Sequence, residues 1–488
     1  MNSSQEPMKS SDSNSANSRV LTLFDCVCII VGTIIGAGIF KMPAIVASNV
    51  PSVTWLVAVW VAGGLVALMG ALCFAELTTT YPDRGGDYGY LKRGYHYRVG
   101  FAFSWAAFWV IRPTSIALMA MIFGEFAVSV FPDTLPLYAF AGLTVIGLSL
   151  TNLIGVRFGK ASQNLLTVAK VAGILVVVAA AFLVWPNAGA PSQEVIGQEV
   201  IAEVPTQINN TVDSAPATEE SGESTWEWFW LSMVFVMFTF GGWNDIAFVA
   251  SETRNPKRNL LRALVVGTGV VLLVYLLVNL ALVAGLGFEQ MASLGSRWEN
   301  ATSVLVEQNM GPVGKDLLSI LVCVSCLGAI NAMIFTSPRI YWATAVDYPS
   351  LRLVAGDVSG KGCWRGILLQ GVVTIAYILT FGNDKNGVEN LTASNAPYFW
   401  SFLGLTVVSL MINRVRFKGQ FDGYRVPLYP VLPVLFVGAC LFMVYRSWTY
   451  MMDQELWLAT AIIGGWVLVG LILSFLLRNE AQESLEHR

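Results

Sequence analysis

The sequence predicts an all-α integral membrane protein with twelve transmembrane helices, two of them broken within the membrane. Three observations lead to this fold class. The 488 residues are 55% hydrophobic and only 12% charged, whereas soluble domains carry about 25% charged residues. Apolar stretches long enough to cross a bilayer recur along almost the whole chain. Two of these stretches, each at the start of one half of the chain, contain closely spaced glycines, which weaken a helix.

Residues 1–19 are rich in Ser and Asn and contain no apolar run, so we expect a disordered tail. The apolar stretch that follows is too long for a signal peptide. The transmembrane domain is expected at residues 20–478, followed by a short tail at 479–488. Its twelve predicted helices are Leu21–Ala47, Val53–Thr80, Val99–Val130, Leu137–Gly155, Ala161–Trp185, Trp228–Ala250, Leu261–Gly285, Leu317–Tyr341, Gly366–Phe381, Tyr398–Ile412, Val426–Arg446 and Leu456–Leu477.

Basic residues predict which side of the membrane each loop faces, because Lys and Arg are enriched in cytoplasmic loops. The chain has 29 Lys and Arg residues, and most of them fall on the side of the N-terminal tail. The loops on the opposite side hold only Arg297, Lys315, Lys385 and Arg446. We therefore expect a multi-pass protein of the cell membrane with both termini in the cytoplasm.

A loop at about residues 186–226 divides the predicted domain into two halves. It contains several acidic residues and no Lys or Arg, so we expect a flexible extracellular connection without chemistry of its own. The repeat before it, about residues 20–185, and the repeat after it, about 227–416, would each supply five helices in opposite topology. Helices eleven and twelve, about 426–477, would be peripheral.

The first helix carries a run from Ile30 to Phe40 that contains three glycines. Each glycine costs a helix about 1 kcal/mol relative to alanine, so we expect a break near Gly36. Backbone groups freed in the membrane must be buried in protein or turned toward a water-filled site. The freed amides at the start of the outer half favour an anion. The alternative is a small-residue face at which two helices pack.

The sixth helix contains a second interruption, Phe238-Thr239-Phe240-Gly241-Gly242-Trp243-Asn244-Asp245. It opens the second half of the chain as the first helix opens the first half. Paired broken helices at corresponding positions indicate a substrate site near the bilayer midplane of a secondary transporter. The pairing therefore favours a transporter over the packing interpretation.

Several segments in chain order carry a resemblance to a known family. They are Val31–Phe40, Cys73–Leu77, Gly85–Tyr88, Ile111–Ser115, Phe238–Asn244, Glu252–Leu260, Asn331–Arg339 and Tyr424–Leu428. Together they resemble the L-type amino acid transporters, the light-subunit-like members of the amino acid–polyamine–organocation superfamily. The similarity extends from Leu21 to Trp448 and implies a leucine-transporter-type five-plus-five inverted repeat with helices 1 and 6 broken.

The resemblance also implies a substrate site at the two breaks. The backbone from Gly36 to Gly38 would hold the carboxylate of an amino acid. Carbonyls near Ile34 and in the helix-six break would take its ammonium, Phe238 would close over the substrate, and Asn244 would lie beside it. The full set of expected substrate-binding residues is Ile34, Gly36, Ala37, Gly38, Ile39, Phe238, Phe240, Gly241, Gly242 and Asn244.

Lys170 lies deep in the fifth helix. A lysine at the bilayer centre costs about 2.5–3.5 kcal/mol on insertion scales, so it needs a partner or a role. By resemblance, Lys170 matches a lysine that reaches the helix-one break, near the position of sodium in sodium-coupled relatives, and we expect it to act in coupling. The alternative is a lysine that extends to water at a helix end.

Asp245 stands where the family often has Tyr, and Lys41 stands where light subunits are usually uncharged. A carboxylate next to the break could select a cationic substrate, carry a proton or pair with Lys41, and the sequence leaves these alternatives open. Glu76 and Arg112 are expected to form structural ion pairs or caps.

The expected function is sodium-independent transport of amino acids by alternating access, as an exchanger. Sodium is not expected to bind because the charge of Lys170 would repel it. The alternatives are a proton-coupled amino acid symporter, a symporter of cationic amino acids or polyamines, and, more distantly, an amino acid sensor on a transporter fold.

No enzyme is expected, because the only histidines, His96 and His487, lie outside the predicted helices and no HExxH zinc motif occurs. The sequence indicates no cofactor, no metal site and no nucleic-acid partner. The expected partners are an amino acid substrate and the lipid bilayer. The loop Phe131–Pro136 lacks the Cys that ties animal light subunits to a glycoprotein, so the resemblance implies no disulfide-linked heavy chain.

Overall fold

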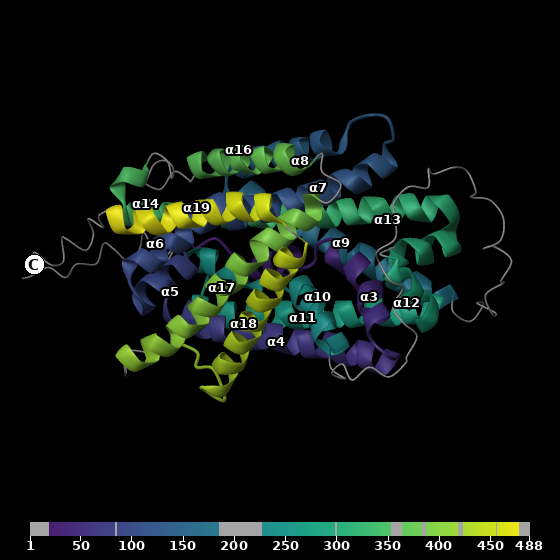
Figure 1. The fold of residues 1–488 in the computed structure, drawn as a ribbon, viewed down its shortest axis with the longest axis horizontal. Helices are drawn as coiled ribbons and strands as arrows, with labels where there is room; N and C mark the ends of the chain where they lie inside the picture. Colours follow the sequence, from purple (N-terminus) through teal and green to yellow (C-terminus); the bar gives the residue numbers. More distant parts are fainter. Residues whose placement is uncertain are drawn as a thin grey trace, which may run out of the picture.

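The computed structural model describes residues 19–82, 85–184, 227–297, 300–352, 364–382, 387–417, 423–454 and 456–477. The predicted tails, apart from Arg19, and the predicted loop 186–226 lie outside these residues. The described part is a bundle in which most long helices run along the longest axis of the molecule (Figure 1). It contains no β-strand, only one isolated bridge between Leu21 and Thr253. The all-α prediction is confirmed.

The helices lie close to the predicted spans. In chain order the main elements are α2 (Leu23–Ile34), α3 (Gly38–Asn49), α4 (Val53–Thr80), α5 (Asp87–Gly94), α6 (Tyr97–Ala106), η1 (Ala107–Ile111), α7 (Arg112–Val130), α8 (Leu137–Ile154), α9 (Val156–Val184), α10 (Glu227–Thr239), η3 (Trp243–Glu252), α11 (Pro256–Leu286), α12 (Phe288–Ser296), α13 (Ala301–Thr336), α14 (Pro338–Asp347), α16 (Trp364–Phe381), α17 (Gly387–Arg416), α18 (Val431–Asp453) and α19 (Trp457–Leu476).

Among the described residues, ten helical segments are long and apolar enough to cross a membrane. The bent pair of α2 and α3 adds an eleventh. The last predicted span corresponds to α19, in which Thr460–Leu476 forms an apolar helix shorter than the ten. The integral membrane fold is therefore confirmed, while the count of twelve spans stays a prediction.

Two helices begin more than ten residues before their predicted bounds. The predicted span Leu317–Tyr341 begins within α13, which starts at Ala301 and is kinked at Gly311, where φ is 64°. The span predicted from Tyr398 is the second part of α17, which begins at Gly387. Both added segments are rich in polar residues, and for this reason a search for apolar runs does not detect them.

Both predicted breaks are present. The first span ends as α2 at Ile34 and resumes as α3 at Gly38, with a bend of 50° between the two helices. The sixth span ends as α10 at Thr239, turns at Gly242 with a φ of 115°, and continues as the 3-10 helix η3. A φ in this range is accessible to glycine without strain, so Gly242 permits the second break.

The two broken spans run in opposite directions. α2 packs against η3, and α3 packs against α10, so the first half of each span lies beside the second half of the other. α11 contacts α2, α4 and η3. Behind the breaks, the rings of Trp60, Phe240 and Tyr275 pack with centroids 5.0 to 6.1 Å apart. This core holds the two breaks together near the middle of the bundle.

Candidate functional site

The ammonium group of Lys170 caps the C-terminal end of α2. Its Nζ donates to the carbonyl oxygens of Gly32 at 3.0 Å, Ile35 at 2.7 Å and Ser325 at 2.8 Å. An ammonium has three donors, so all of them are used. A helix end leaves its last carbonyls without intrahelical partners, and Lys170 supplies partners for two of them. Because the side chain is completely buried, the alternative of a lysine that extends to water is wrong.

Two small residues on α13 complete this cap. The Ser325 hydroxyl lies 3.1 Å from the carbonyl oxygen of Ile35 and 3.0 Å from that of Gly36. A β-carbon on Gly328 would lie only 2.6 Å from Cε of Lys170, so glycine leaves the room that the lysine needs. Neither residue is recognisable from sequence, because small residues are common wherever membrane helices pack.

One face of α9 is polar along its contact with α2. Gln163, Thr167 and Lys170 recur at spacings of four and three residues, which places them on one side of a helix. Thr167 donates to the carbonyl oxygen of Cys28 at 3.0 Å. A β-carbon on Gly32 would lie 2.1 Å from Nε2 of the Gln163 side chain, so α9 approaches α2 closely here. The spacing was present in the sequence and would have extended the Lys170 prediction to this whole face.

The hydroxyl of Tyr275 joins the two breaks. It lies 3.1 Å from the carbonyl oxygen of Ile34 and 3.1 Å from that of Thr239. These are the last residues of α2 and α10. A tyrosine hydroxyl has one proton to donate, so a single donor serves two helix ends. Tyr275 is a site residue that sequence reasoning missed, because a tyrosine in an apolar helix carries no distinctive pattern.

Glycines let the two breaks approach one another. A β-carbon on Gly38 would lie 3.3 Å from Cγ2 of Thr239, and one on Gly242 would lie 2.8 Å from Cγ2 of Thr33. Directly after the first break, the Phe40 amide donates to the carbonyl oxygen of Ala37 at 3.1 Å, whereas the amides before it in the first turn of α3 have no intrahelical acceptors. The predicted run Gly36–Gly38 therefore lies where the positive end of a helix dipole meets the second break.

Two predicted residues can contribute only their backbone to a site at the breaks. The side chain of Ile39 is completely buried and that of Phe240 is 1% exposed, and the Phe240 ring packs in the core behind the breaks. Phe238 is half-buried at the end of α10. Its carbonyl oxygen accepts a hydrogen bond from the Gly241 amide at 3.2 Å. The role of Phe238 as a gate stays a prediction.

Asp245 pairs with Arg112 and not with Lys41. The two terminal nitrogens of the Arg112 guanidinium donate to the two carboxylate oxygens of Asp245, each at 2.7 Å. The Thr336 hydroxyl lies 3.3 Å from the same carboxylate. Both partners are buried, and the guanidinium also lies over the ring of Phe248. Of the alternatives left open for Asp245, the pair with Lys41 is wrong, while Lys41 is exposed on α3.

A π-helical turn, η1, places Arg112 in this position. The third span is helical from α6 to α7, and η1 ends at the residue before Arg112. A π turn carries one extra residue and rotates the side chains that follow it, and such turns often mark functional positions. The irregularity was not predicted from the sequence, although Pro113, which follows Arg112 and has no backbone N–H to donate, is a signal of it.

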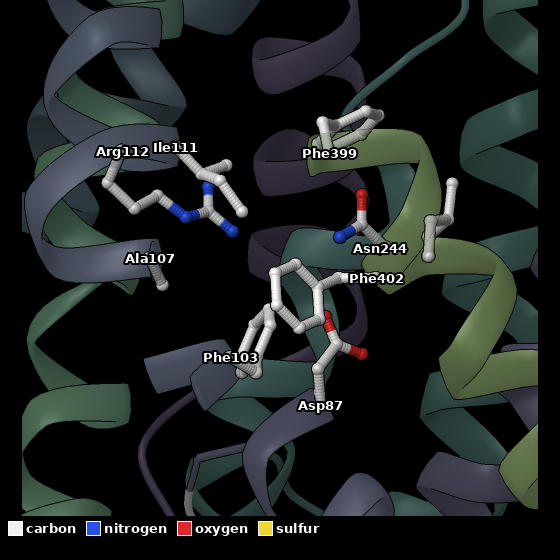
Figure 2. A pocket seen from close by; sticks show the side chains of 9 residues that line it. Asp87, Phe103, Ala107, Ile111, Arg112, Asn244, Phe399 and Phe402 are labelled. Carbon is white, nitrogen blue, oxygen red and sulfur yellow. The ribbon is translucent and has the colours of Figure 1, made fainter. Parts of the chain in front are cut away.

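A small, partly enclosed cavity lies beside Arg112, which pairs with Asp245 (Figure 2). Its volume is about 10 Å³, close to the least that holds one water molecule. Figure 2 shows polar groups converging from different elements, with Arg112 on one side, Asn244 on the other and Asp87 below. The residues that line the cavity are Asp87, Phe103, Ala107, Ile111, Arg112, Asn244, Phe399, Phe402 and Leu403. Asn244, predicted to lie beside the substrate, thus adjoins a polar cluster that the sequence did not reveal.

Ion pairs link the helices at the end of the bundle where α2 begins and η3 ends. They join α2 to α9, α5 to α14, η3 to α14, and α4 to α17. The pairs are Asp25–Lys160 at 3.0 Å, Lys92–Asp347 at 2.5 Å, Glu252–Arg339 at 3.0 Å and Glu76–Arg414. Glu76 is therefore part of a structural ion pair, as predicted. These four ion pairs hold the helices together at this end of the bundle.

Comparison with known proteins gives a consistent result. A sequence model of the amino acid permease family matches residues 21–472. The b(0,+)-type amino acid transporter 1 of Mus musculus is 27% identical over 445 residues, which cover 88% of this chain and 84% of that protein. The serine/threonine exchanger SteT of Bacillus subtilis is 27% identical over 86% of this chain and 89% of its own length. The large neutral amino acids transporter small subunit 2 of Mus musculus is 27% identical over 89% and 76%.

Proposed function

The chain belongs to the amino acid permease family, and on this premise we propose that it is a sodium-independent amino acid exchanger of the cell membrane. The observation that carries the proposal is the Lys170 ammonium among the carbonyl oxygens at the end of α2. Such carbonyls lie at the negative end of a helix dipole and suit a cation. Here the cation is a covalent part of the protein.

A bound sodium ion at the same place would be repelled by Lys170. Two unit charges 4 Å apart repel by about 4 kcal/mol at an effective dielectric constant of 20. The ion would also find its carbonyl ligands already engaged by the ammonium. Transport therefore proceeds without sodium at this position.

The substrate is held by its two charged groups at the breaks. The carboxylate lies at the freed amides of the first turn of α3, where the dipole is positive. The ammonium lies at carbonyls of Ile34 and of the second break. A carbonyl oxygen has two lone pairs, so Ile34 can accept from the substrate as well as from Tyr275. The side chain of the substrate then extends toward Phe238 and Asn244.

Exchange follows from a cation that never leaves the protein. In an ion-coupled transporter, release of the ion allows the empty carrier to return to its starting conformation. Lys170 cannot be released, so the return step is best made with a second amino acid bound. Among the relatives, SteT of Bacillus subtilis is by its name a serine/threonine exchanger, which supports this mode.

The end of the bundle that the four ion pairs hold together is the cytoplasmic side in this proposal, and it is closed in this state, because it lies on the side of the basic loops. Release of substrate to the cytoplasm then requires the pairs Asp25–Lys160 and Glu252–Arg339 to separate. The chain carries out this cycle without a disulfide-linked heavy chain, because its loop at Phe131–Pro136 contains no Cys.

Uptake of radiolabelled amino acids by proteoliposomes tests the proposal. The natural amino acids are screened with vesicles that are either empty or loaded with unlabelled amino acid. We expect uptake to be stimulated strongly by internal amino acid. Equal uptake into loaded and empty vesicles would contradict exchange, and stimulation by an inward proton gradient alone would favour symport instead.

A further inference from the structure

The charges around the cavity of Figure 2 do not balance. The terminal nitrogens of Arg112 are both committed to Asp245, so this pair is neutral as a whole. The carboxyl group of Asp87 remains. It is 3% exposed, and its Oδ1 has no hydrogen-bond partner among the described residues. A buried carboxylate without a counter-charge of its own is strongly unfavourable and takes up a neutralising ligand.

The backbone holds Asp87 firmly in this environment. Asp87 is the first residue of α5, and the two preceding glycines, Gly85 and Gly86, have φ values of 95° and 48°. A β-carbon on Gly86 would lie 2.9 Å from the carbonyl carbon of Ala247 in η3. The two glycines therefore allow the start of α5 to pack closely against η3. Asp87 cannot reach water unless α5 and η3 separate.

We propose that Asp87 is a proton-binding site, protonated while the cavity is closed and deprotonated when the α5 end of the bundle opens to water. The proton adds to the free carboxylate, and the resulting O–H donates to an acceptor. Asn244 and Thr406 lie beside Asp87, and Asn244 Oδ1 is a buried acceptor without a partner among the described residues. Asn244 lines the same cavity as Asp87, and one water molecule in it could bridge the two groups.

A proton fits this cavity better than a metal cation does. A metal cation would have to enter a space of about 10 Å³ that is also lined by the Arg112 guanidinium, and like charges repel in a buried site. A proton removes the charge of Asp87 where it stands and needs no additional ligands. The same argument excludes an anion, which would add to the charge of Asp87.

The electrostatics of the surroundings also favour the protonated form of Asp87. Burial raises the pKa of Asp87 from 3.8 to about 7, and the charge of Asp245 acts in the same direction. The charge of Arg112 and hydrogen bonding by Asn244 and Thr406 lower the pKa without cancelling the effect of burial. On α14, Asp347 is already paired with Lys92 of α5. The groups that face Asp87 therefore leave it titrating near neutral pH.

The direction of the pH effect follows from linkage. The closed state binds the proton more tightly than a state in which Asp87 meets water, so acidification stabilises the closed state. The stabilisation of the closed state grows as the pH falls below about 7, is complete below about 3.8, where both states are protonated, and is lost as the pH rises through about 7. Between these limits the ratio of closed to open protein changes by up to about tenfold per pH unit. Its link to transport, through Asn244, depends on the proposed function.

Infrared difference spectroscopy of the purified full-length protein tests proton binding without any transport assay. The spectrum is recorded from about pH 5 to about pH 9, spanning both sides of neutrality. We expect a band of a protonated carboxylic acid that disappears with a midpoint near pH 7 in the natural protein. It should be missing in Asp87→Asn and retained in Asp347→Asn, the matched acid on α14. Persistence of the band in Asp87→Asn, or its loss on addition of sodium at constant pH, would overturn the proposal.

Exchange in proteoliposomes across the same pH series then tests the link to transport. We expect a pH dependence in the natural protein that is flat in Asp87→Asn and shifted in Asp87→Glu, with folding of each variant checked by thermal unfolding. If the chain moves no amino acid at all, the proposed function fails, whereas the infrared result still decides proton binding. A folded Asp87→Asn protein with the unchanged pH profile of the natural protein would contradict the proposal.

Discussion

The ammonium of Lys170 lies 2.7 Å from the carbonyl oxygen of Ile35, so the middle of α9 is joined directly to the break between α2 and α3. The same nitrogen bonds to Ser325 of α13. Motion of α2 away from α9 would leave a charged group and several carbonyls without partners in a buried site, which is costly. We therefore infer that α2 pivots about this point during transport and does not separate from it.

Tyr275→Phe should weaken substrate binding. The substitution keeps the ring and removes the one donor shared by Ile34 and Thr239, so the two breaks are no longer held together. We expect a loss of stability of about 1–3 kcal/mol from the unpaired carbonyls and a loss of substrate affinity of about tenfold, or 1.4 kcal/mol. Binding is measured by isothermal titration calorimetry on the purified protein.

Tyr377→Phe is the matched control for Tyr275→Phe. Tyr377 is also a buried tyrosine whose hydroxyl donates to a backbone carbonyl, that of Trp109 at 3.0 Å, but it lies away from the breaks. It should lower stability similarly and leave affinity unchanged. Equal affinity loss in both variants would show that the effect of Tyr275→Phe is a general loss of stability.

Gly242→Ala should destabilise the protein. The residue has a φ of 115°, and its β-carbon would lie 2.8 Å from Cγ2 of Thr33. Strained backbone of this kind costs about 1–3 kcal/mol, and the contact adds to it. Thermal unfolding in detergent measures the change. Gly269→Ala, in α11 with open space around its β-carbon, should leave the melting temperature unchanged or raise it, because alanine favours a helix over glycine, and a melting temperature lowered equally by both would contradict the argument.

Asp245→Asn should lower stability more than it changes substrate preference. It leaves the buried Arg112 guanidinium without its counter-charge, which typically costs about 3–5 kcal/mol. The double variant Arg112→Gln with Asp245→Asn removes both charges and should recover part of this loss. A folded Asp245→Asn protein that exchanges amino acids of a different side-chain charge would instead support the hypothesis that Asp245 selects the substrate.

Phe238→Ala and Phe240→Ala should affect different properties. Phe238 is half-buried at the break, and its truncation should cut exchange strongly while the protein stays folded. Phe240 is buried against Trp60 and Tyr275, and its truncation should cost about 3–5 kcal/mol of stability. Uptake assays and thermal unfolding of both variants separate the two effects. Normal uptake by Phe238→Ala would contradict the gate.

The fold and the breaks could be predicted because their causes are local in sequence. Apolar length determines a membrane helix, and the glycines of Gly36–Gly38 and Gly241–Gly242 weaken a helix wherever it lies. The importance of Lys170 could be predicted because a charge inside an apolar span is rare. These features can be recognised without knowing which residues pack against them in the folded protein.

The partners of these residues could not be predicted in the same way. The pair of Arg112 and Asp245 joins positions 133 residues apart, and the π turn that orients Arg112 has no distinctive composition. Tyr275 is one aromatic residue among many in an apolar chain. Asp87 belongs to a segment that carries the resemblance, but its burial and the commitment of Arg112 to Asp245 depend on packing between elements far apart in the sequence.

The most direct test of the central claim, that Lys170 takes the place of a coupling cation, is exchange in proteoliposomes with all sodium replaced by choline. Vesicles loaded with unlabelled substrate take up labelled substrate at constant pH and ionic strength. We predict the same initial rate in both salts, because the carbonyl oxygens of Gly32, Ile35 and Ser325 already accept from the lysine. Loss of uptake in choline, restored by adding sodium, would contradict the account.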